Sequence, residues 1–509
     1  MKTKHRYILL SFLIGICFSC SNDISIEKDK YKPLYHFTRD EGWIGEPAGL
    51  LYDNGIYHVF YQYNPTENVY GNIHWGHAVS KDLIHWDTLA IALFPDNKGY
   101  LCSGSVIADR NNTSKLGNDT QYPFIAFYTY QNSQSDQYIF WAYSLDKGIT
   151  WEKGDSIILS DINDPISNPH ITWNKFSKEW LMTVSSESSV QFYTSKDCIH
   201  WQYESTFEDI GTYANRWEGC DFFPIQVDGK EEFKWVLLVN MGNGSPSGTS
   251  ATRYFVGDFN GSQFQVTQSK ELWLDYGKDF YSISTFDIAT NDHRLAIGWM
   301  NCWEYANLLP TLKWRGNLTI PRELKLTYED NFYLLSSTPI NNIKKYIKEK
   351  YYIGETELSE TKSFKCKFPY PNSSFIIKLK FNNTDNLAIW KSRDYGIRLK
   401  TDMNEILTLG YQNELSSYYI DRTSLKGNPD EVGFQQLMGA NYRSNSTISD
   451  WWIFFDKNSI ELFASQGKVS MTSLCYPKGK FITLEIFAKE GTVKLIDATI
   501  EKLDDTIIH

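Results

Sequence analysis

One pattern occurs three times in this sequence: SKDLIHW at Ser80–Trp86, SLDKGITW at Ser144–Trp151 and SKDCIHW at Ser195–Trp201. Each copy follows a run of β-branched and aromatic residues and is typical of a strand, a Ser-x-Asp turn and a tryptophan. The tryptophans lie 65 and 50 residues apart, a spacing that fits one four-stranded sheet with its loops per unit. The repeat predicts propeller blades. Three similar hairpins in a sandwich are the alternative, but a propeller gives each short sheet a neighbour against which to bury its face.

The rest of the chain is typical of an all-β protein. Segments 56–63 and 180–184 are short, rich in β-branched and aromatic residues, and bounded by turn residues. One stretch, 341–350, is the clearest helix candidate. Later strands such as 375–380 and 452–455 lack the Ser-x-Asp-Trp pattern and predict an antiparallel β-sandwich. We therefore predict a β-propeller over 32–335 and a C-terminal β-sandwich over 336–509.

Composition excludes several classes of protein. The chain has 509 residues, of which 42% are hydrophobic and 22% charged, as in a soluble globular protein rather than a disordered one. The net charge of -11 and the lack of a basic stripe argue against a nucleic-acid partner. Aromatic residues make up 16% of the chain, and their flat rings suit both strands and the apolar faces of sugars.

The first residues are typical of a targeting signal. Lys2, Lys4 and Arg6 precede an apolar run over 8–18 that is shorter than a membrane span and fits a signal sequence. The run ends in a small residue followed by Cys20, which resembles a bacterial lipobox. We predict a signal peptide over 1–19, a lipidated Cys20, a tether over 20–31 and a location at the bacterial cell envelope, in the periplasm or on the outer surface. An ordinary secretory signal is the alternative.

The cysteines and histidines give no metal or redox signature. Six cysteines outside the leader are widely spaced without a CxxC pair: Cys102, Cys198, Cys220, Cys302, Cys366 and Cys475. This spacing predicts isolated buried thiols and no metal site, with a disulfide as the alternative outside the cytoplasm. We expect no cofactor.

Longer motifs carry a family resemblance. They are FYQYNP (60–65), GNIHWGHAVS (71–80), WEGCDFFPI (217–225), SATRYFVGDFNG (250–261), WLDYGKDFYS (273–282), IGWMNCWEYA (297–306), WRGNLTIPREL (314–324) and IFFDKNSIELF (453–463). The chain resembles glycoside hydrolase family 32, the invertases, inulinases and levanases. The resemblance implies a five-bladed propeller with a C-terminal sandwich. It also implies retaining cleavage of β-fructosides by two carboxyl groups, one attacking the anomeric carbon and one protonating the leaving oxygen.

The resemblance implies that Glu218 is the acid/base. Glu218 of WEGCD matches the family's Glu-Cys-Pro-Asp motif. Asp221 then follows as a partner that would keep the pKa of Glu218 raised. A surface glutamate beside a packed tryptophan is the alternative, and the flanking motif argues against it.

The nucleophile position differs from the family pattern Trp-Met-Asn-Asp-Pro-Asn-Gly. This chain has WIGEPAG over 43–49, so that Glu46 stands where the attacking aspartate belongs. The extra methylene moves the carboxylate oxygen by about 1 Å, and such a displacement costs roughly 100-fold in rate unless the backbone compensates. Gly45 replaces an asparagine whose side chain would contact the sugar.

The third family position also differs. The family's Arg-Asp-Pro, whose aspartate stabilises the transition state, aligns with Ser167-Asn168-Pro169 because Trp173 follows at the expected spacing. Asn168 can bond a hydroxyl but supplies no negative charge, so an electrostatic contribution is missing. Asp164 of Asn163-Asp164-Pro165 is a second candidate, four residues earlier.

The resemblance implies further sugar contacts. Gln62, Ser103 and Trp303 match family sugar-binding positions unchanged, whereas Tyr70 replaces a tryptophan and Cys102 replaces a phenylalanine. Strand-end polar residues without a sugar partner are the alternative for Gln62 and Ser103. Loops at the end of a propeller usually carry the function.

Three functions fit these observations. We predict a glycoside hydrolase that acts on levan, inulin or sucrose, on the strength of Glu218, Glu46 and the aromatic residues. A non-catalytic fructan-binding surface lipoprotein is the second reading, supported by the loss of both family aspartates and by the anchor. A glycosidase for another sugar is the third, supported by the altered contacts. The predicted partners are an oligo- or polysaccharide and, through the lipid anchor alone, a membrane.

Overall fold

A computed structural model describes residues 30–131, 138–158, 166–186, 188–208, 217–287, 293–382, 392–444 and 446–507. The predicted signal peptide and Cys20 lie outside these ranges, as does Asp164. Residues from Tyr31 onward form one compact unit. In the part of the chain that is described, no helix has the length and apolar character needed to cross a membrane.

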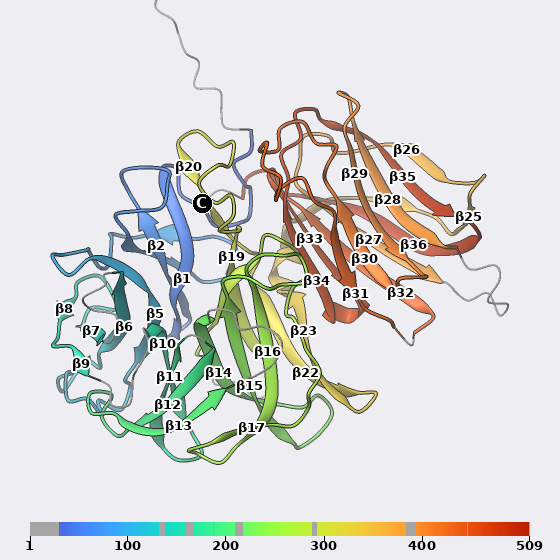
Figure 1. Ribbon diagram of the computed structural model, residues 1–509. Coiled ribbons are helices and arrows are strands. Elements are labelled where there is room, and N and C mark those ends of the chain that lie inside the picture. The colour runs from blue at the N-terminus through green and yellow to red at the C-terminus, as the bar shows by residue number, and fades with distance from the viewer. Residues whose placement is uncertain are drawn as a thin grey trace, which may run out of the picture. The chain divides into compact units, whose positions relative to one another are not determined.

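Five small antiparallel sheets follow one another along the first two thirds of the chain (Figure 1). The first holds β1 (Gly42–Asp53), β2 (Ile56–Asn64), β3 (His74–Ser80) and β4 (Asp87–Thr88). The second holds β5 (Tyr100–Ala108), β6 (Phe124–Gln131), β7 (Tyr138–Ser144), β8 (Glu152–Lys153) and β9 (Ile157–Ile158). The third holds β10 (Ile166–Asn174), β11 (Glu179–Ser186), β12 (Ser189–Ser195) and β13 (Gln202–Glu208). The fourth holds β14 (Trp217–Gln226), β15 (Phe233–Met241), β16 (Ala251–Phe259) and β17 (Phe264–Val266). The fifth holds β18 (Tyr281–Thr285), β19 (Arg294–Met300), β21 (Asn317–Leu318), β22 (Arg322–Glu329) and β23 (Phe332–Pro339).

The first strand of each sheet faces a common centre. β1, β5, β10, β14 and β18 are spatial neighbours of one another in that order, and β18 closes back on β1. The ring is closed by β20 (Trp314–Arg315), which lies in sequence between β19 and β21 of the fifth sheet but pairs in parallel with β1 of the first. The five sheets are therefore the five blades of a propeller.

The Ser-x-Asp-Trp repeat forms the turn between the third and fourth strands of the first three blades. In the first copy, Ser80 Oγ accepts the backbone N–H of Leu83 at 2.8 Å, and the Asp82 carboxylate accepts the N–H groups of Ile84 and His85 at 2.9 and 2.8 Å. Hydrogen bonds of the same kind hold the other two copies. Short polar side chains favour such turns because they bond the nearby backbone. The sequence repeat is thus a repeat of turn chemistry.

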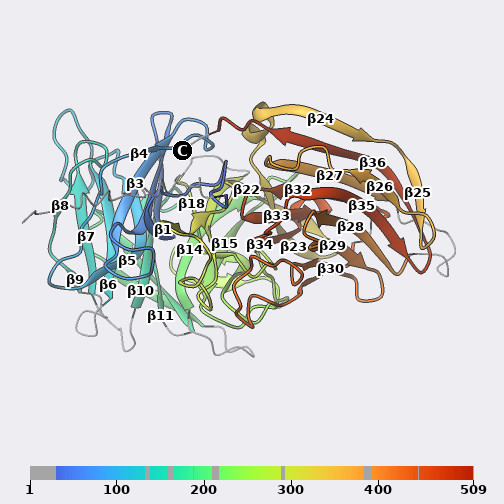
Figure 2. The same cartoon turned by 90° about the horizontal axis from the view of Figure 1, so that it is seen from above.

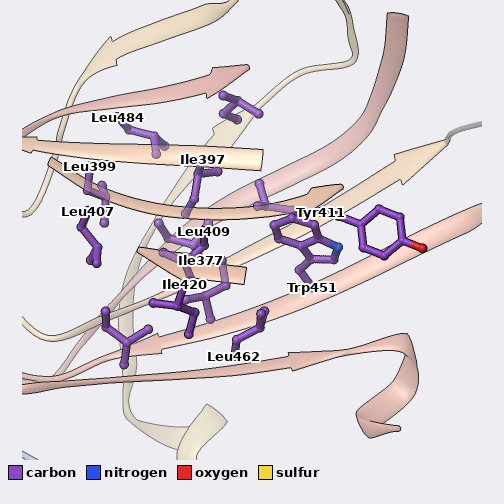
Figure 3. Close-up of a cluster of buried hydrophobic side chains, with 14 of the residues drawn as sticks. Ile377, Ile397, Leu399, Leu407, Leu409, Tyr411, Ile420, Trp451, Leu462 and Leu484 are labelled. Carbon is purple, nitrogen blue, oxygen red and sulfur yellow. The ribbon is translucent and has the colours of Figure 1, made fainter. Parts of the chain in front are cut away.

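Two further sheets, one of seven strands and one of six, make up the rest of the chain (Figure 2). One holds β24 (Ile347–Ile353), β25 (Thr356–Ser359), β27 (Phe375–Asn382), β32 (Ile448–Phe455), β33 (Ser459–Ala464), β34 (Val469–Leu474) and β36 (Thr492–Leu503). The other holds β26 (Phe364–Lys367), β28 (Asp394–Thr401), β29 (Ile406–Gln412), β30 (Ser417–Asp421), β31 (Met438–Asn441) and β35 (Phe481–Lys489). Apolar side chains from both sheets, including Ile377, Leu399, Leu409, Trp451 and Leu484, form one buried core (Figure 3). The predicted fold, a five-bladed propeller followed by a β-sandwich, is confirmed.

Two local expectations need correction. The predicted boundary at 335/336 lies inside β23, which continues to Pro339, and Ser336 and Ser337 are buried and paired with β22. Small polar residues there fill an inter-strand position rather than a linker. The helix candidate 341–350 forms only a short 3₁₀ helix, η1 (Asn341–Tyr346), before β24. A second 3₁₀ turn, η2, spans Ser465–Gly467.

A buried charged network joins the fifth blade to the sandwich. Arg322 of β22 donates to Asp275 at 2.8 Å and also to Glu461 of β33. Glu461 lies 2.8 Å from the ring of His36, whose other nitrogen lies 2.8 Å from Asp456. All five side chains are buried. Because a buried charge is stable only when it is paired, this network fixes the fifth blade against the sandwich.

Candidate active site

A β-bulge interrupts each of the five innermost strands. The pairing register shifts near the start of β1, β5, β10, β14 and β18. A bulge inserts an extra residue and redirects the side chains beside it. The side chains at or beside the five bulges include Glu46, Ser103, Asn168, Glu218 and Ser282. These residues are far apart in sequence and, as described below, contact one another.

Glu46 is buried and is held by two hydroxyl groups. Its Oε2 atom accepts hydrogen bonds from Ser282 Oγ at 3.0 Å and from Ser103 Oγ at 3.1 Å. The Gln62 amide donates in turn to Ser103 Oγ at 2.9 Å. Only 6% of Glu46 is exposed. Blades 1, 2 and 5 thus converge on one carboxylate.

Gly45 leaves space that a neighbouring tryptophan fills. A Cβ atom at position 45 would lie 2.4 Å from the Trp43 ring and 2.9 Å from Gln62 Oε1. The sequence suggested that Gly45 merely removes a sugar contact. In the structure, a side chain at position 45 would collide with the Trp43 ring. The backbone next to Glu46 therefore requires glycine at this position.

Glu218 on β14 is the second carboxyl group of the site. The Tyr281 hydroxyl donates a hydrogen bond to Glu218 Oε2. Gly242 makes room for the same carboxyl group, because a Cβ there would lie 3.0 Å from Glu218 Cδ. Tyr281 and Ser282 are consecutive residues, so the start of β18 contacts both carboxyl groups.

The two carboxyl groups influence each other electrostatically. Burial, followed by the nearby charge of Glu218, raises the pKa of Glu46 to about 7, against the opposing hydrogen bonds from Ser282, Ser103 and Trp303. A nearby negative charge favours the protonated form of a carboxyl group. The Glu46 carboxyl therefore keeps its proton to a higher pH than an ordinary glutamate does.

Asn168 supports the backbone of Glu218 from the neighbouring blade. Its Nδ2 atom donates to the carbonyl oxygen of Glu218 at 2.6 Å. Asn168 has a φ of +40°, in the left-handed region that asparagine tolerates better than most residues. An ionised aspartate could not donate this hydrogen bond. Ser167 precedes it in β10 and pairs with Ser185, while its side chain lies outside the described part of the molecule.

Aromatic rings line the carboxyl pair. The Trp303 ring centroid lies 5.1 Å from that of Tyr70 and 6.0 Å from that of Trp43. Burial raises the pKa of Tyr70, with further contributions from Cys102 and Glu46, so the Tyr70 hydroxyl lies in the same electrostatic environment as these groups. The predicted residues Tyr70, Cys102 and Trp303 therefore gather around Glu46.

Asp221 is held by residues from two other blades. Its carboxylate accepts the backbone N–H of Thr285 at 2.7 Å and lies 3.0 Å from His170 Nε2, and it is 1% exposed. These contacts tie β14 to β10 and β18. His170 and Thr285 also line a small cavity between the innermost strands. Burial alone would raise the pKa of Asp221, but His170 and the hydrogen bonds outweigh burial and lower it. Asp221 is therefore a charged group that links three blades.

The sequence motifs did not single out Ser282 or Tyr281. Both lie at the end of the WLDYGKDFYS motif. In the structure, Ser282 stands out because it is buried and has a φ of +49°. Among the described residues, no three His, Cys, Asp or Glu side chains are arranged to hold a metal ion. The six described cysteines are present as thiols, four buried and two partly exposed.

Comparison with known proteins places the chain in a family. The profile of the "Glycosyl hydrolases family 32 N-terminal domain" matches residues 36–339, and that of the "Glycosyl hydrolases family 32 C terminal" matches residues 342–502. The chain belongs to glycosyl hydrolase family 32. Family 32 thus accounts for both the propeller and the sandwich.

Relatives of this family 32 chain match along nearly its whole length. The levanase of Bacillus subtilis is 35% identical over 97% of this chain and 74% of its own. Invertase 2 of Saccharomyces cerevisiae is 30% identical over 92% of both chains. The crystal structure of exo-inulinase from Aspergillus awamori superimposes with a TM-score of 0.84, at 28% identity over 94% of this chain and 99% of that one.

Proposed function

We propose that this protein is a retaining β-fructosidase in which Glu46 is the nucleophile and Glu218 the acid/base. The observation that carries the proposal is the pairing of the buried Glu46 carboxyl with Glu218, each held by hydroxyl donors from β18. Retaining glycosidases use one carboxylate to attack and one carboxylic acid to protonate the leaving oxygen. Levan, inulin and sucrose are the proposed substrates because the family 32 relatives include a levanase, exo-inulinases and invertases.

The proposed reaction has two balanced steps. First, an oxygen of the Glu46 carboxylate bonds to the anomeric carbon while the glycosidic bond breaks and Glu218 gives its proton to the departing oxygen. Second, Glu218 takes a proton from water, the water oxygen bonds to the anomeric carbon, and the bond to Glu46 breaks. The Tyr70 and Trp303 rings provide the apolar surface against which a sugar ring packs.

Asn168 changes the electrostatics of this reaction. It supplies no charge beside the positive charge that develops on the sugar, so Glu46 provides the nearby negative charge. Its hydrogen bond to the Glu218 carbonyl instead fixes the backbone that presents the acid. Asn168 is therefore proposed as a positioning residue.

Measurement of sugar release tests the function. Wild-type protein incubated with levan, inulin and sucrose should release fructose from at least one of them. Binding of these glycans without release of fructose would instead indicate a non-catalytic glycan-binding protein. The replacement of the family's aspartates at positions 46 and 168 favours this alternative. Release of sugar only from non-fructoside glycans would support the third reading.

Glu46→Asp should lower turnover by about 100-fold. The shorter side chain withdraws the carboxylate by about 1 Å from the attacking position. The carboxylate also moves away from the Ser103 and Ser282 hydroxyls, which bond to Oε2 in the wild type. The backbone cannot shift to compensate, because the Trp43 ring occupies the space beside it. Steady-state kcat on the best of the three substrates is the measurement. A higher kcat for Glu46→Asp would show instead that the site is a weakened aspartate site.

We also propose that Cys20 carries a lipid anchor at the cell envelope. The support is the short apolar run followed by Ser19-Cys20. Mass spectrometry of the N-terminal peptide from the membrane fraction should find acylated Cys20, and Cys20→Ala should leave the protein unacylated. A mature N-terminus at another residue, on protein free in the medium, would contradict the proposal.

A further inference from the structure

Two consecutive side chains of β18 reach two different carboxyl groups. Tyr281 donates to Glu218, and Ser282 donates to Glu46 at 3.0 Å. In a regular strand, successive side chains point to opposite faces of the sheet. Here the pairing shifts between Tyr281, opposite Trp299, and Ser284, opposite Ile297. The bulge therefore allows both side chains to enter the same site.

Ser282 has a backbone conformation that favours glycine. Its φ is +49° and it is 4% exposed. A non-glycine residue in this region is strained and persists where the surrounding structure imposes it, often at functional sites. Compared with glycine, serine adds one hydroxyl group here, and that hydroxyl donates to Glu46 Oε2.

We propose that Ser282 is a positioning residue for the nucleophile: its hydroxyl, together with that of Ser103, fixes Glu46 Oε2 and favours the ionised form of Glu46, which is the form that attacks. This inference rests on the proposed roles of the two glutamates. Because both hydroxyls converge on Oε2, we infer that Oε1 is the oxygen that attacks.

Several other groups face Glu46 and set the balance against which Ser282 acts. Glu218 on β14 disfavours a negative charge on Glu46, and Tyr70, whose pKa is raised by burial, lies in the same environment. Burial and Glu218 raise the pKa of Glu46 to about 7, while Ser282, Ser103 and Trp303 oppose that rise. Loss of the Ser282 hydroxyl should therefore raise the pKa of Glu46 further.

The rate should follow the ionisation state of Glu46. The reactive form has an ionised Glu46. Loss of the Glu46 proton therefore sets the acid limb of kcat/KM, at about pH 7 in the wild type. Without the Ser282 hydroxyl, this limb should move to higher pH, because a hydrogen bond that favours the ionised form is lost.

Two substitutions separate the hydroxyl from the backbone. Ser282→Ala removes the hydroxyl at unchanged strain, and Ser282→Gly removes it while relieving strain, which favours folding. Each should raise the titration midpoint of Glu46 by about one pH unit and thereby lower kcat/KM by about tenfold on the acid side of that midpoint. The midpoint is read from carboxyl-carbon NMR of protein labelled at glutamate, with the Glu46 signal assigned from Glu46→Gln. Ser284→Ala, two residues along β18 and facing the cavity between the innermost strands, is the matched control and should change neither quantity.

If the titration midpoint of Glu46 in Ser282→Gly and Ser282→Ala equals that of the wild type, the inference is overturned, even if activity falls. The hydroxyl would then have only a packing role. The NMR titration needs no turnover. Absence of fructose release by the wild type would contradict the proposed function while the Glu46 midpoint still decides the role of Ser282.

Discussion

Glu46→Gln should lower kcat on levan, inulin or sucrose by at least about 10³-fold. Glutamine keeps the shape of the side chain but has no anionic oxygen, so the covalent step through the anomeric carbon is lost. The Ser103 and Ser282 hydroxyls can still donate to the amide oxygen. The loss should therefore lie in kcat, with binding of the glycan retained, as measured by turnover and by calorimetric binding on the same preparation.

The pH dependence of stability shows whether this variant is correctly folded. The pKa of Glu46 is raised in the folded state to about 7, so the contribution of this group to stability is full below about pH 4 and is lost as pH rises to 7. Glutamine does not ionise, so this loss of stability with rising pH is absent in Glu46→Gln. The variant should thus exceed the wild type in free energy of unfolding by roughly 3 kcal/mol at pH 8 and by little at pH 4. A variant that is inactive and less stable at pH 8 would contradict this account of Glu46.

Glu218→Gln should lower kcat by about 100-fold or more on substrates with a poor leaving group. Its carboxyl proton is the one given to the leaving oxygen, and general acid catalysis typically contributes factors of this size. A fructoside with an acidic, aryl leaving group needs little protonation. The variant should therefore lose much less activity in the first step on that substrate, and initial-burst kinetics measure this step.

Glu232→Gln is the matched control for this substitution. Glu232 also accepts a hydrogen bond from a tyrosine, Tyr333, at 2.6 Å, but it lies on the partly exposed side of blades 4 and 5. It should leave turnover unchanged. Equal losses on aryl and natural fructosides in Glu218→Gln would be inconsistent with a proton donor.

Local chemistry explains which parts of the fold could be predicted from sequence. The Ser-x-Asp-Trp turns are complete within eight residues, so their repeat marked three blades directly. Blades 4 and 5 lack this turn, and their prediction came from the family resemblance. The limit of blade 5 was misplaced because Ser336 and Ser337 have linker-like composition yet pair within β23.

The site was predictable where a residue lies in a recognisable motif. Glu46, Gln62, Ser103 and Glu218 belong to such motifs, and they contact one another or share an environment in the structure. Ser282 was missed because its role depends on a bulge and a positive φ, which hydrophobic periodicity does not encode. The residues that hold Asp221, His170 and Thr285, come from other blades, and the local sequence around Asp221 could not have named them.

The residue that becomes covalently bound to sugar tests the central claim most directly. Glu218→Gln protein, mixed with an activated fructoside such as fructosyl fluoride and quenched in acid, should accumulate the intermediate because the second step lacks its base. Peptide mass spectrometry should then find one fructosyl unit on the peptide that contains Glu46, localised to Glu46 itself. The wild type should release fructose with retained anomeric configuration. A fructosyl unit on another residue, or inverted product with no adduct, would contradict Glu46 as the nucleophile.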